Sequence, residues 1–296
     1  MDQNVKTYQL LAEKFAQWAQ GEGGIRAALM IGSRARADHP ADQWADLDLI
    51  VVAADPGPYL ASSAWLSAIA VPWLTFIETS GDGRVLERRA LFEGGLDVDF
   101  AFLPLEMARQ MAQFGLPPDV ADMFRRGARL LLDKDDLFAS IMDLAGAPLP
   151  PVSPPSPDEF MNLVNDFWYH AVWSAKHLRR GELWWAKSGC DDHMKYLLRR
   201  MLEWHARLRH GPEHDTWLRG RFLEEWADPR AVKELHQTFA HYDAQDIWRA
   251  LFATMDLFRW LSYEAAGSLG YGYPRLGEQH ATGLVQELLE TGTAQG

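Results

Sequence analysis

Cysteine is almost absent from this chain of 296 residues, since Cys190 is the only one. A single cysteine excludes a disulfide bond within the chain and any zinc cluster built from several thiolates. Long apolar runs are also missing, and the N-terminal segment has neither the basic start nor the apolar core of a signal peptide. We therefore expect a cytoplasmic protein that does not bind a membrane.

Positive charge is scarce as well. The chain has 29 lysines and arginines against 41 aspartates and glutamates, which gives a formal net charge of −12. This balance argues against a nucleic-acid-binding protein and favours either cationic partners or plain solubility. Several catalytic fingerprints are missing too: we find no Walker A motif, no Rossmann glycine pattern, no G-x-S-x-G motif and no HExxH-type spacing among the ten histidines.

Proline, in contrast, is concentrated in one segment. The stretch APLPPVSPPSPDEF, residues 147–160, contains six prolines and therefore cannot continue a helix or a central strand. Before it the apolar pattern switches between helical and strand periods, and after it the pattern is almost entirely helical. We predict an α/β (α+β) domain over residues 1–147, a proline-rich linker over 148–157 and an all-helical bundle domain over 158–296.

The apolar periods also predict the individual elements. In the first domain we expect helices at residues 8–20, at 59–70 and from Leu105, and strands at 25–32, 46–54, 73–80, 85–94 and 96–104. Short glycine turns between the later strands favour antiparallel neighbours, so the sheet should be mixed. In the second domain we expect a helix capped by Asp158, a long helix kinked near Gly189, and helices at 215–226, 230–240, 244–266 and 279–290. A cleft between the two domains is the expected ligand site.

Two acids interrupt an apolar run in the stretch DLDLIV. Asp46 and Asp48 lie two residues apart on an expected strand, so their side chains project from the same face. Carboxylates among apolar residues are costly unless something pairs with them. A same-face pair can hold divalent cations, which prefer hard oxygen ligands. The alternative is a strand with one solvated face, and the Asp-x-Asp pattern alone leaves both interpretations open.

Two further motifs favour the metal-binding interpretation. In IGSRA, Gly32 at the end of a strand allows backbone N–H groups to approach an anion, while Ser33 adds a hydroxyl donor and Arg34 a charge. In GLDVDFAFLP, Asp97 and Asp99 again alternate with apolar residues, and Asp99 would complete a carboxylate triad. An ordinary turn and a solvated strand face, the latter mainly for Asp97, remain the alternatives.

Together these motifs resemble the polymerase-β-like nucleotidyltransferases. More closely, the chain resembles the aminoglycoside 6-adenylyltransferase, or streptomycin adenylyltransferase, family, and the resemblance covers nearly the whole sequence. In the first domain it is carried by IGSRA, DLDLIV and DVDFAFLP, which are shared by the wider superfamily. In the second it is carried by the more specific stretches NDFWYHAVWSAKHLRRGELWWAK, LLRRMLEWHA, ALFATMDLFRWLS and YGYP.

The resemblance implies transfer of AMP from ATP to a hydroxyl of a cationic aminoglycoside antibiotic, foremost streptomycin, which would be inactivated. It implies that Gly32, Ser33 and Arg34 bind the triphosphate. Lys176 and Lys187 of the helical domain would reach the departing phosphates, although solvated helix charge is an equally simple explanation of both lysines. We expect a monomer whose partners are ATP and the antibiotic.

The resemblance also implies roles for the acids. Asp46 and Asp48 would hold Mg²⁺, and Asp99 would act as a further metal ligand or as the general base. Because streptomycin carries guanidinium groups, its site needs carboxylates, and we predict four of them: Asp97, Glu78, Asp191 and Asp192. Two other functions remain open, a nucleotidyltransferase acting on a different hydroxyl and a silent binding protein with the same fold. The intact triad argues against the second.

Overall fold

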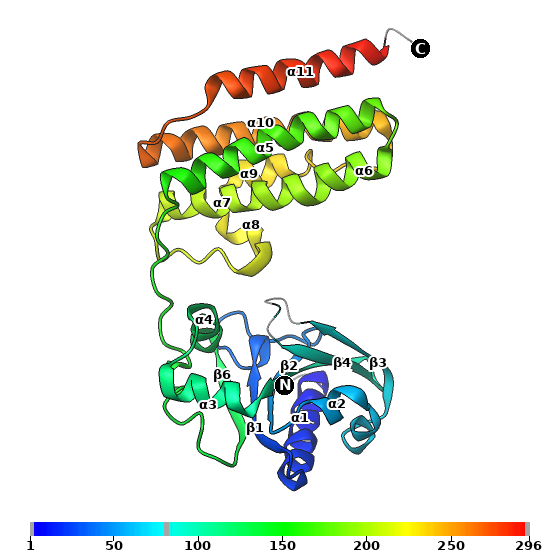
Figure 1. The fold of residues 1–296 in the computed structure, drawn as a ribbon, viewed down its shortest axis with the longest axis vertical. Coiled ribbons are helices and arrows are strands. Elements are labelled where there is room, and N and C mark those ends of the chain that lie inside the picture. Colours follow the sequence, from blue (N-terminus) through cyan, green and yellow to red (C-terminus); the bar gives the residue numbers. More distant parts are fainter. Residues whose placement is uncertain (1–2, 80–82, 84, 294–296) are drawn as a thin grey trace. The chain divides into compact units, whose positions relative to one another are not determined.

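The computed structural model describes residues 3–79, 83 and 85–293, and the chain divides into two compact units, residues 1–150 and 151–296 (Figure 1). Each unit has a hydrophobic core of its own. In the described part of the chain, no helix has the length and apolar character needed to cross a membrane.

The first unit is built on a six-stranded mixed sheet in the order β3-β4-β5-β2-β1-β6. The strands are β1 (Ile25–Ile31), β2 (Leu47–Ala53), β3 (Pro72–Thr79), β4 (Leu86–Phe92), β5 (Leu96–Pro104) and β6 (Ala128–Asp133). Neighbouring strands are antiparallel except β2 and β5, which run parallel. The mixed sheet predicted from the sequence is confirmed, and β6 is an additional strand that the sequence analysis missed.

Helices cover both faces of this sheet. They are α1 (Gln3–Gly21), α2 (Gly57–Ala61), α3 (Leu105–Phe114) and α4 (Pro118–Arg126), with 3-10 turns at Gly32–Arg34, Ala64–Ala68 and Met142–Leu144. Phe15 of α1 belongs to the core on one face, and Phe124 of α4 belongs to the core on the other. The helix α4 was not predicted.

Strand β2 contributes to both cores because its side chains alternate. Leu47, Leu49 and Val51 belong to the α1 side, and Val52 belongs to the α4 side. Asp48 has the same parity as Val52, so its carboxylate leaves the sheet on the α4 side. The strand that carries the acid is therefore fixed by apolar burial on both of its faces.

The helix predicted over residues 59–70 is wrong in its middle. It is split into α2 and the 3-10 turn Ala64–Ala68, with Ser62 extended between them. The buried guanidinium of Arg88 in β4 donates to the carbonyl oxygens of Tyr59 and Leu60, and Ser62 Oγ accepts from the N–H of Ala64. In a longer helix, these carbonyl and N–H groups would bond to each other along the helix. Because they bond to side chains here, the helix ends.

The second unit is entirely helical in its described residues. Its helices are α5 (Pro157–Arg179), α6 (Leu183–Ser188), a π-helical segment (Gly189–His193), α7 (Met194–His210), a 3-10 turn (Leu218–Gly220), α8 (Leu223–Trp226), α9 (Pro229–Leu235), α10 (Ala244–Leu269) and α11 (Arg275–Thr293). Phe167 of α5 stacks on Phe258 of α10 with ring centroids 3.6 Å apart. The helical bundle predicted from the sequence is confirmed.

The N-cap of α5 is Ser156 rather than the predicted Asp158. Ser156 Oγ accepts from the N–H of Glu159 at 3.2 Å, and the N–H of Ser156 donates to the Glu159 carboxylate at 2.8 Å. This is a capping box, and Pro157 takes the first helical position because it has no N–H to satisfy. The preceding proline-rich segment bonds within the same unit, since Tyr271 Oη donates to the carbonyl of Pro155.

The helix predicted over residues 215–226 is also largely wrong. Trp217, Arg219 and Phe222 have φ values of 51°, 57° and 55°, which a right-handed helix does not allow. The N–H of Trp217 donates to Asp215 Oδ1 at 2.9 Å, so the aspartate forms a local turn in place of a helical start. Only α8 is α-helical in this stretch, beside the short 3-10 turn Leu218–Gly220.

The two candidate caps of α5 can be separated by mutation. Ser156→Ala should lower the free energy of unfolding by about 1 kcal/mol, because it removes the side-chain half of the capping box. Asp158→Ala, which removes only a favourable charge near the helix N-terminus, should cost about 0.3 kcal/mol. Urea unfolding followed by circular dichroism measures both. An equal or larger loss for Asp158→Ala would contradict the assignment of Ser156 as the cap.

Candidate active site

Three carboxylates from different parts of the first unit meet at one end of the sheet. The ligand oxygens of Asp46, Asp48 and Asp99 all lie within 4.8 Å of one another, and all three side chains are half-buried. Asp48 stands directly opposite Asp99 because β2 and β5 pair in parallel with Leu47 opposite Val98. The predicted grouping of these three acids is therefore present, and carboxylate oxygens at this separation suit a hard divalent cation.

The turn that precedes the acids in the sequence lies beside them. Gly32 begins the 3-10 turn after β1 with a φ of +72°, and a Cβ at this position would overlap the carboxylate of Asp48. Glycine is therefore required both for the backbone conformation and for the close approach. The Oγ of Ser33 is buried and has no hydrogen-bond partner among the described residues. A buried hydroxyl left in this state can bind an oxygen atom of a ligand.

A second glycine packs against the backbone next to this turn. Gly127, between α4 and β6, has a φ of +151°, and a Cβ there would lie 2.5 Å from the carbonyl oxygen of Ala35. The α4–β6 connection therefore lies against the backbone that follows the turn. This contact requires glycine in the same way as Gly32 does, since no side chain fits between the two backbones.

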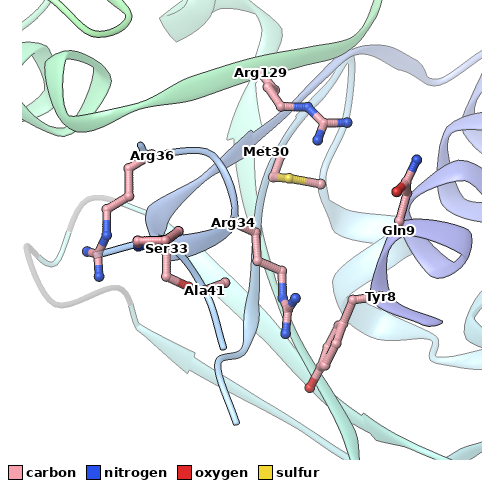
Figure 2. A pocket seen from close by; sticks show the side chains of 9 residues that line it. Tyr8, Gln9, Met30, Ser33, Arg34, Arg36, Ala41 and Arg129 are labelled. Carbon is pink, nitrogen blue, oxygen red and sulfur yellow. The ribbon is translucent and has the colours of Figure 1, made fainter. Parts of the chain in front are cut away.

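Arg34 has a more structural position than the sequence analysis assigned to it. Its Nε donates to the carbonyl of Asp46 at 2.8 Å, and its Nη2 donates to the carbonyl of Ala45. The guanidinium lies 3.5 Å from the centroid of the Tyr8 ring. Figure 2 shows the two side chains next to each other. Arg34 thus fixes the backbone that leads into β2 and holds the Asp-Leu-Asp segment against α1.

The same tyrosine accounts for Asp97. Tyr8 Oη donates to Asp97 Oδ1 at 2.7 Å, and the N–H of Asp97 donates back to Tyr8 Oη at 3.2 Å. Burial and the neighbouring Asp97 carboxylate raise the pKa of Tyr8 to about 12. Asp97 therefore has a defined partner on α1, and no signal in the sequence pointed to this tyrosine.

A cavity of about 210 Å³ opens beside the turn (Figure 2). Ser33 and Arg34 line it, together with Tyr8 from α1 and Arg129 from β6. Arg129 stands next to Met30, its partner in the β1–β6 ladder, and is exposed. The cavity therefore combines hydroxyl and guanidinium donors, which suit an anion. Arg129 was missed because β6 was not recognised as a strand of this sheet.

Strand β4 adds a basic residue that the sequence analysis also missed. Arg89 is the cross-strand partner of Asp99, and its Nη2 lies 3.1 Å from Asp99 Oδ2. The same nitrogen lies 3.5 Å from Glu78 of β3 and 3.5 Å from Glu87. One guanidinium thus faces three carboxylates on a single face of the sheet. Glu78, predicted to bind the acceptor, is part of this group, and the alternation of Glu87 and Arg89 on β4 was the overlooked signal.

The pKa of Asp99 is shifted by this environment. Its pKa is raised to about 6, mainly by burial. The attraction of Arg89 opposes this increase, and the negative charges of Asp46, Glu87 and Asp97 contribute to it. Perturbed carboxylates of this kind are common in catalytic sites.

Comparison with known proteins identifies the family. The sequence profile of the family described as streptomycin adenylyltransferase matches residues 5–288. The chain belongs to this family. Aminoglycoside 6-adenylyltransferase of Bacillus subtilis (strain 168) is 23% identical to it over 279 residues, covering 91% of this chain and 94% of the relative. The protein of the same name from Campylobacter jejuni is 22% identical, with coverages of 91% and 92%.

A solved structure described as an aminoglycoside 6-adenyltransferase from Bacillus subtilis aligns with a TM-score of 0.45 and 18% identity, over 98% of this chain and 99% of that one. The family match itself extends over both units. The family and the enzyme class predicted from the sequence, a nucleotidyltransferase, are confirmed.

The remaining predicted residues of this streptomycin adenylyltransferase family member lie in the second unit. Lys176 on α5 is exposed. Lys187 Nζ donates to the carboxylate of Asp191 and, at 2.5 Å, to the carbonyl of Ala240. Asp191 also lies 3.8 Å from Lys195, whereas Asp192 is exposed. Lys187 and Asp191 are thus paired with each other, although the sequence analysis had assigned them to phosphate and to acceptor.

The raised pKa of Asp99 leads to a stability prediction for metal-free protein. Its ordinary pKa is 3.8 and its folded-state pKa is about 6, so ionisation of Asp99 destabilises the folded state as the pH rises through this range. Asp99→Asn should therefore stabilise the protein at pH 7.5, by about 1 kcal/mol once solvent screening is considered. The gain should shrink as the pH falls toward 4.5, because the Asp99 carboxyl group is then mostly protonated in the folded state. Urea unfolding in EDTA measures it.

The matched control is Asp192→Asn, which replaces an exposed aspartate of the second unit. Its effect on the unfolding midpoint should be small and should not change between pH 4.5 and 7.5. A stabilisation by Asp99→Asn of the same size at both pH values would show that ionisation of Asp99 carries no cost in the folded state.

Proposed function

We propose that this protein transfers AMP from ATP to a hydroxyl group of an aminoglycoside, with streptomycin as the foremost acceptor. The observation that carries the proposal is the meeting of Asp46, Asp48 and Asp99 beside the Gly32–Ser33 turn. A nucleotide with its metal ion requires carboxylates that bind the cation and, next to them, a turn that binds the phosphates.

The donor set at this site fits Mg²⁺. All three groups are carboxylates, and the all-oxygen set matches the preference of a hard cation. Asp46 and Asp48 would hold the ion, and a carboxylate oxygen of Asp99 lies close enough to serve as a third ligand. When bound, Mg²⁺ neutralises phosphate charge and orients an in-line displacement at the α-phosphorus.

The nucleotide phosphates would lie against the turn. The unsatisfied Oγ of Ser33 supports this, because the hydroxyl would donate a hydrogen bond to a phosphate oxygen. Arg129, which lines the cavity beside Ser33, adds positive charge. Lys176 is an additional candidate for phosphate because it is exposed, whereas Lys187 would first have to leave Asp191.

Asp99 would act on the acceptor. In the proposed step the acceptor oxygen bonds to the α-phosphorus, the bond to the β-phosphate oxygen breaks, and pyrophosphate leaves. The hydroxyl proton passes to Asp99, whose pKa of about 6 suits a base near neutral pH. Arg89 would hold the Asp99 carboxylate in place through the 3.1 Å contact.

The choice of acceptor rests on charge and on the relatives. Both relatives described above are named aminoglycoside 6-adenylyltransferases, and the family description names streptomycin. Arg89 faces Glu78, Glu87 and Asp99, so this sheet face carries more negative than positive charge. Guanidinium and ammonium groups would be attracted to it. Asp97, Asp191 and Asp192 remain predicted acceptor ligands.

The acids can be tested through pyrophosphate release from ATP and streptomycin in the presence of Mg²⁺. Asp46→Asn and Asp48→Asn should each abolish turnover, because each removes a negative charge from the metal ligands. Asp99→Asn should lower kcat by about 10²–10⁴-fold, the range for loss of a general base, while ATP still binds. EDTA should stop the wild-type reaction.

The control is Asp122→Asn, an aspartate of α4 that pairs with Arg125 on the same helix. It should leave the rate unchanged. Activity retained by Asp46→Asn or Asp48→Asn would contradict the metal assignment. A collapse of ATP affinity in Asp99→Asn, with kcat preserved at saturation, would make Asp99 a metal ligand rather than the base.

Salt should affect the reaction if a negative site attracts a cationic acceptor. The second-order rate for streptomycin should fall as the ionic strength rises, because the attraction is screened over about 10 Å at 0.1 M salt. The rate is compared at low and high salt for streptomycin and for neutral hydroxyl compounds. A salt-independent rate, or a neutral compound that reacts faster, would indicate a nucleotidyltransferase with a different acceptor.

A further inference from the structure

The second unit contains a group of metal-ligating side chains that the proposed reaction does not use. Asp166 and His170 of α5 and His193 of the π-helical segment offer ligand atoms that all lie within 4.8 Å of one another. Among the described residues, this group and the carboxylate triad are the two sets of three such side chains with this spacing. The two sets differ in chemistry, since one has only oxygen donors and the other has two imidazoles.

All three side chains converge on a single oxygen atom. His170 Nδ1 lies 2.6 Å from Asp166 Oδ1, and His193 Nε2 lies 3.0 Å from the same atom. The imidazole rings are 4.0 Å apart between centroids. His170 Nδ1 also lies 3.0 Å from the backbone carbonyl of Asp166. Small rotations of these side chains would bring two nitrogens and one oxygen around a common centre about 2.0–2.2 Å from each.

The backbone brings these residues together by two separate means. Asp166 and His170 are four residues apart on α5, so they lie on the same side of the helix. His193 reaches them from a π-helical segment, a local widening that is frequent at functional sites. Gly189 at the start of this segment allows the approach, because a Cβ there would overlap the ring of Trp173 on α5.

The exposure of the group suits an ion that enters from solvent. The side chains of His170, Asp166 and His193 are 26%, 32% and 40% exposed, so they are neither core residues nor freely solvated. A carboxylate bonded to two imidazoles needs no metal to be satisfied. However, helix packing does not require two half-exposed imidazoles on one carboxylate, and a cation that replaces their protons would use all three groups.

We propose that Asp166, His170 and His193 bind a divalent transition metal ion, of which Zn²⁺ is the representative. Two imidazole nitrogens and one carboxylate suit Zn²⁺ and its neighbours in the first transition row, whereas Mg²⁺ and Ca²⁺ prefer oxygen-only sites. With three protein ligands, the fourth position of a tetrahedral ion remains for water or a ligand atom. The bound ion links α5 to the π-helical segment and stabilises the folded unit by mass action.

The test uses the full chain, free of tags and stripped of metal. Zn²⁺ is titrated by calorimetry in the presence of excess Mg²⁺, which occupies oxygen-only sites. The wild type should bind one Zn²⁺ ion, and its thermal unfolding temperature should rise. His170→Gln and His193→Gln should each weaken binding at least tenfold, since each removes one of three ligands.

Two control variants test the location of the ion. His177→Gln removes another histidine of α5 that is paired with one carboxylate, that of Glu182, and is absent from the three-residue group. Asp48→Asn alters the carboxylate triad of the first unit. Both should bind Zn²⁺ within twofold of the wild type. The proposal is overturned if the wild type binds no Zn²⁺, if the two histidine variants bind as tightly as the wild type, or if Asp48→Asn causes the loss.

A spectroscopic measurement on the wild type avoids dependence on the folding of any variant. Co²⁺ bound by two imidazoles and a carboxylate in a four-coordinate site gives strong visible absorption, whereas Co²⁺ held by oxygen atoms in six-coordinate geometry absorbs weakly. The intense spectrum should appear on addition of one equivalent of Co²⁺ and disappear when Zn²⁺ is added. A weak spectrum alone would contradict the proposal.

Discussion

The parallel pairing of β2 with β5 is the constraint on which the candidate active site depends. It sets Asp48 opposite Asp99. The apolar residues that alternate with these acids along the two strands are buried on both faces of the sheet, and they fix the register. A shift by one residue would turn an aspartate into the core and a leucine into solvent. The burial of Leu47, Val98 and Phe100 therefore holds together carboxylates that repel one another.

Arginine side chains complete this arrangement on two sides. Arg34 binds the backbone of Ala45 and Asp46, so the segment before β2 cannot swing away from the turn. Arg89 balances part of the negative charge from β4. The two arginines act in different ways: one acts as a backbone clamp and the other as a counter-charge. Neither needs to touch a substrate to be necessary for the position of the acids.

Much of this site was predictable from the sequence, because each of its acids alternates with apolar residues that reveal a strand. The same alternation predicted the mixed sheet, and helical periods predicted the bundle. The failures have local causes. Side-chain and arginine bonds to the backbone ended the helix expected at 59–70, and an aspartate turn replaced the one expected at 215–226. Such bonds leave no periodic signal.

Partners across the sheet were the other gap. Arg89 and Tyr8 contact Asp99 and Asp97 from segments separated in sequence, and Arg129 lies on a strand that was not recognised. His170 and His193 carry no motif because their meeting depends on a π-helical segment. Contacts such as that of Tyr8 with Asp97 require the topology, because the two segments are far apart in the sequence and no turn joins them.

The two glycines at the Gly32–Arg34 turn and beside it have a consequence for how the sequence can vary. Gly32 and Gly127 both have positive φ, and both face atoms that leave no room for a side chain. Substitution at either position would displace the backbone next to the acids. The loop that follows the turn is held by the carbonyl of Ser33, which accepts a backbone N–H, and by Arg34, which donates to the backbone just before β2. In contrast, residues 37, 38 and 42–44 of this loop have exposed side chains. Amino-acid substitutions should therefore be tolerated mainly in this loop, whereas the two glycine positions should not accept any other amino acid.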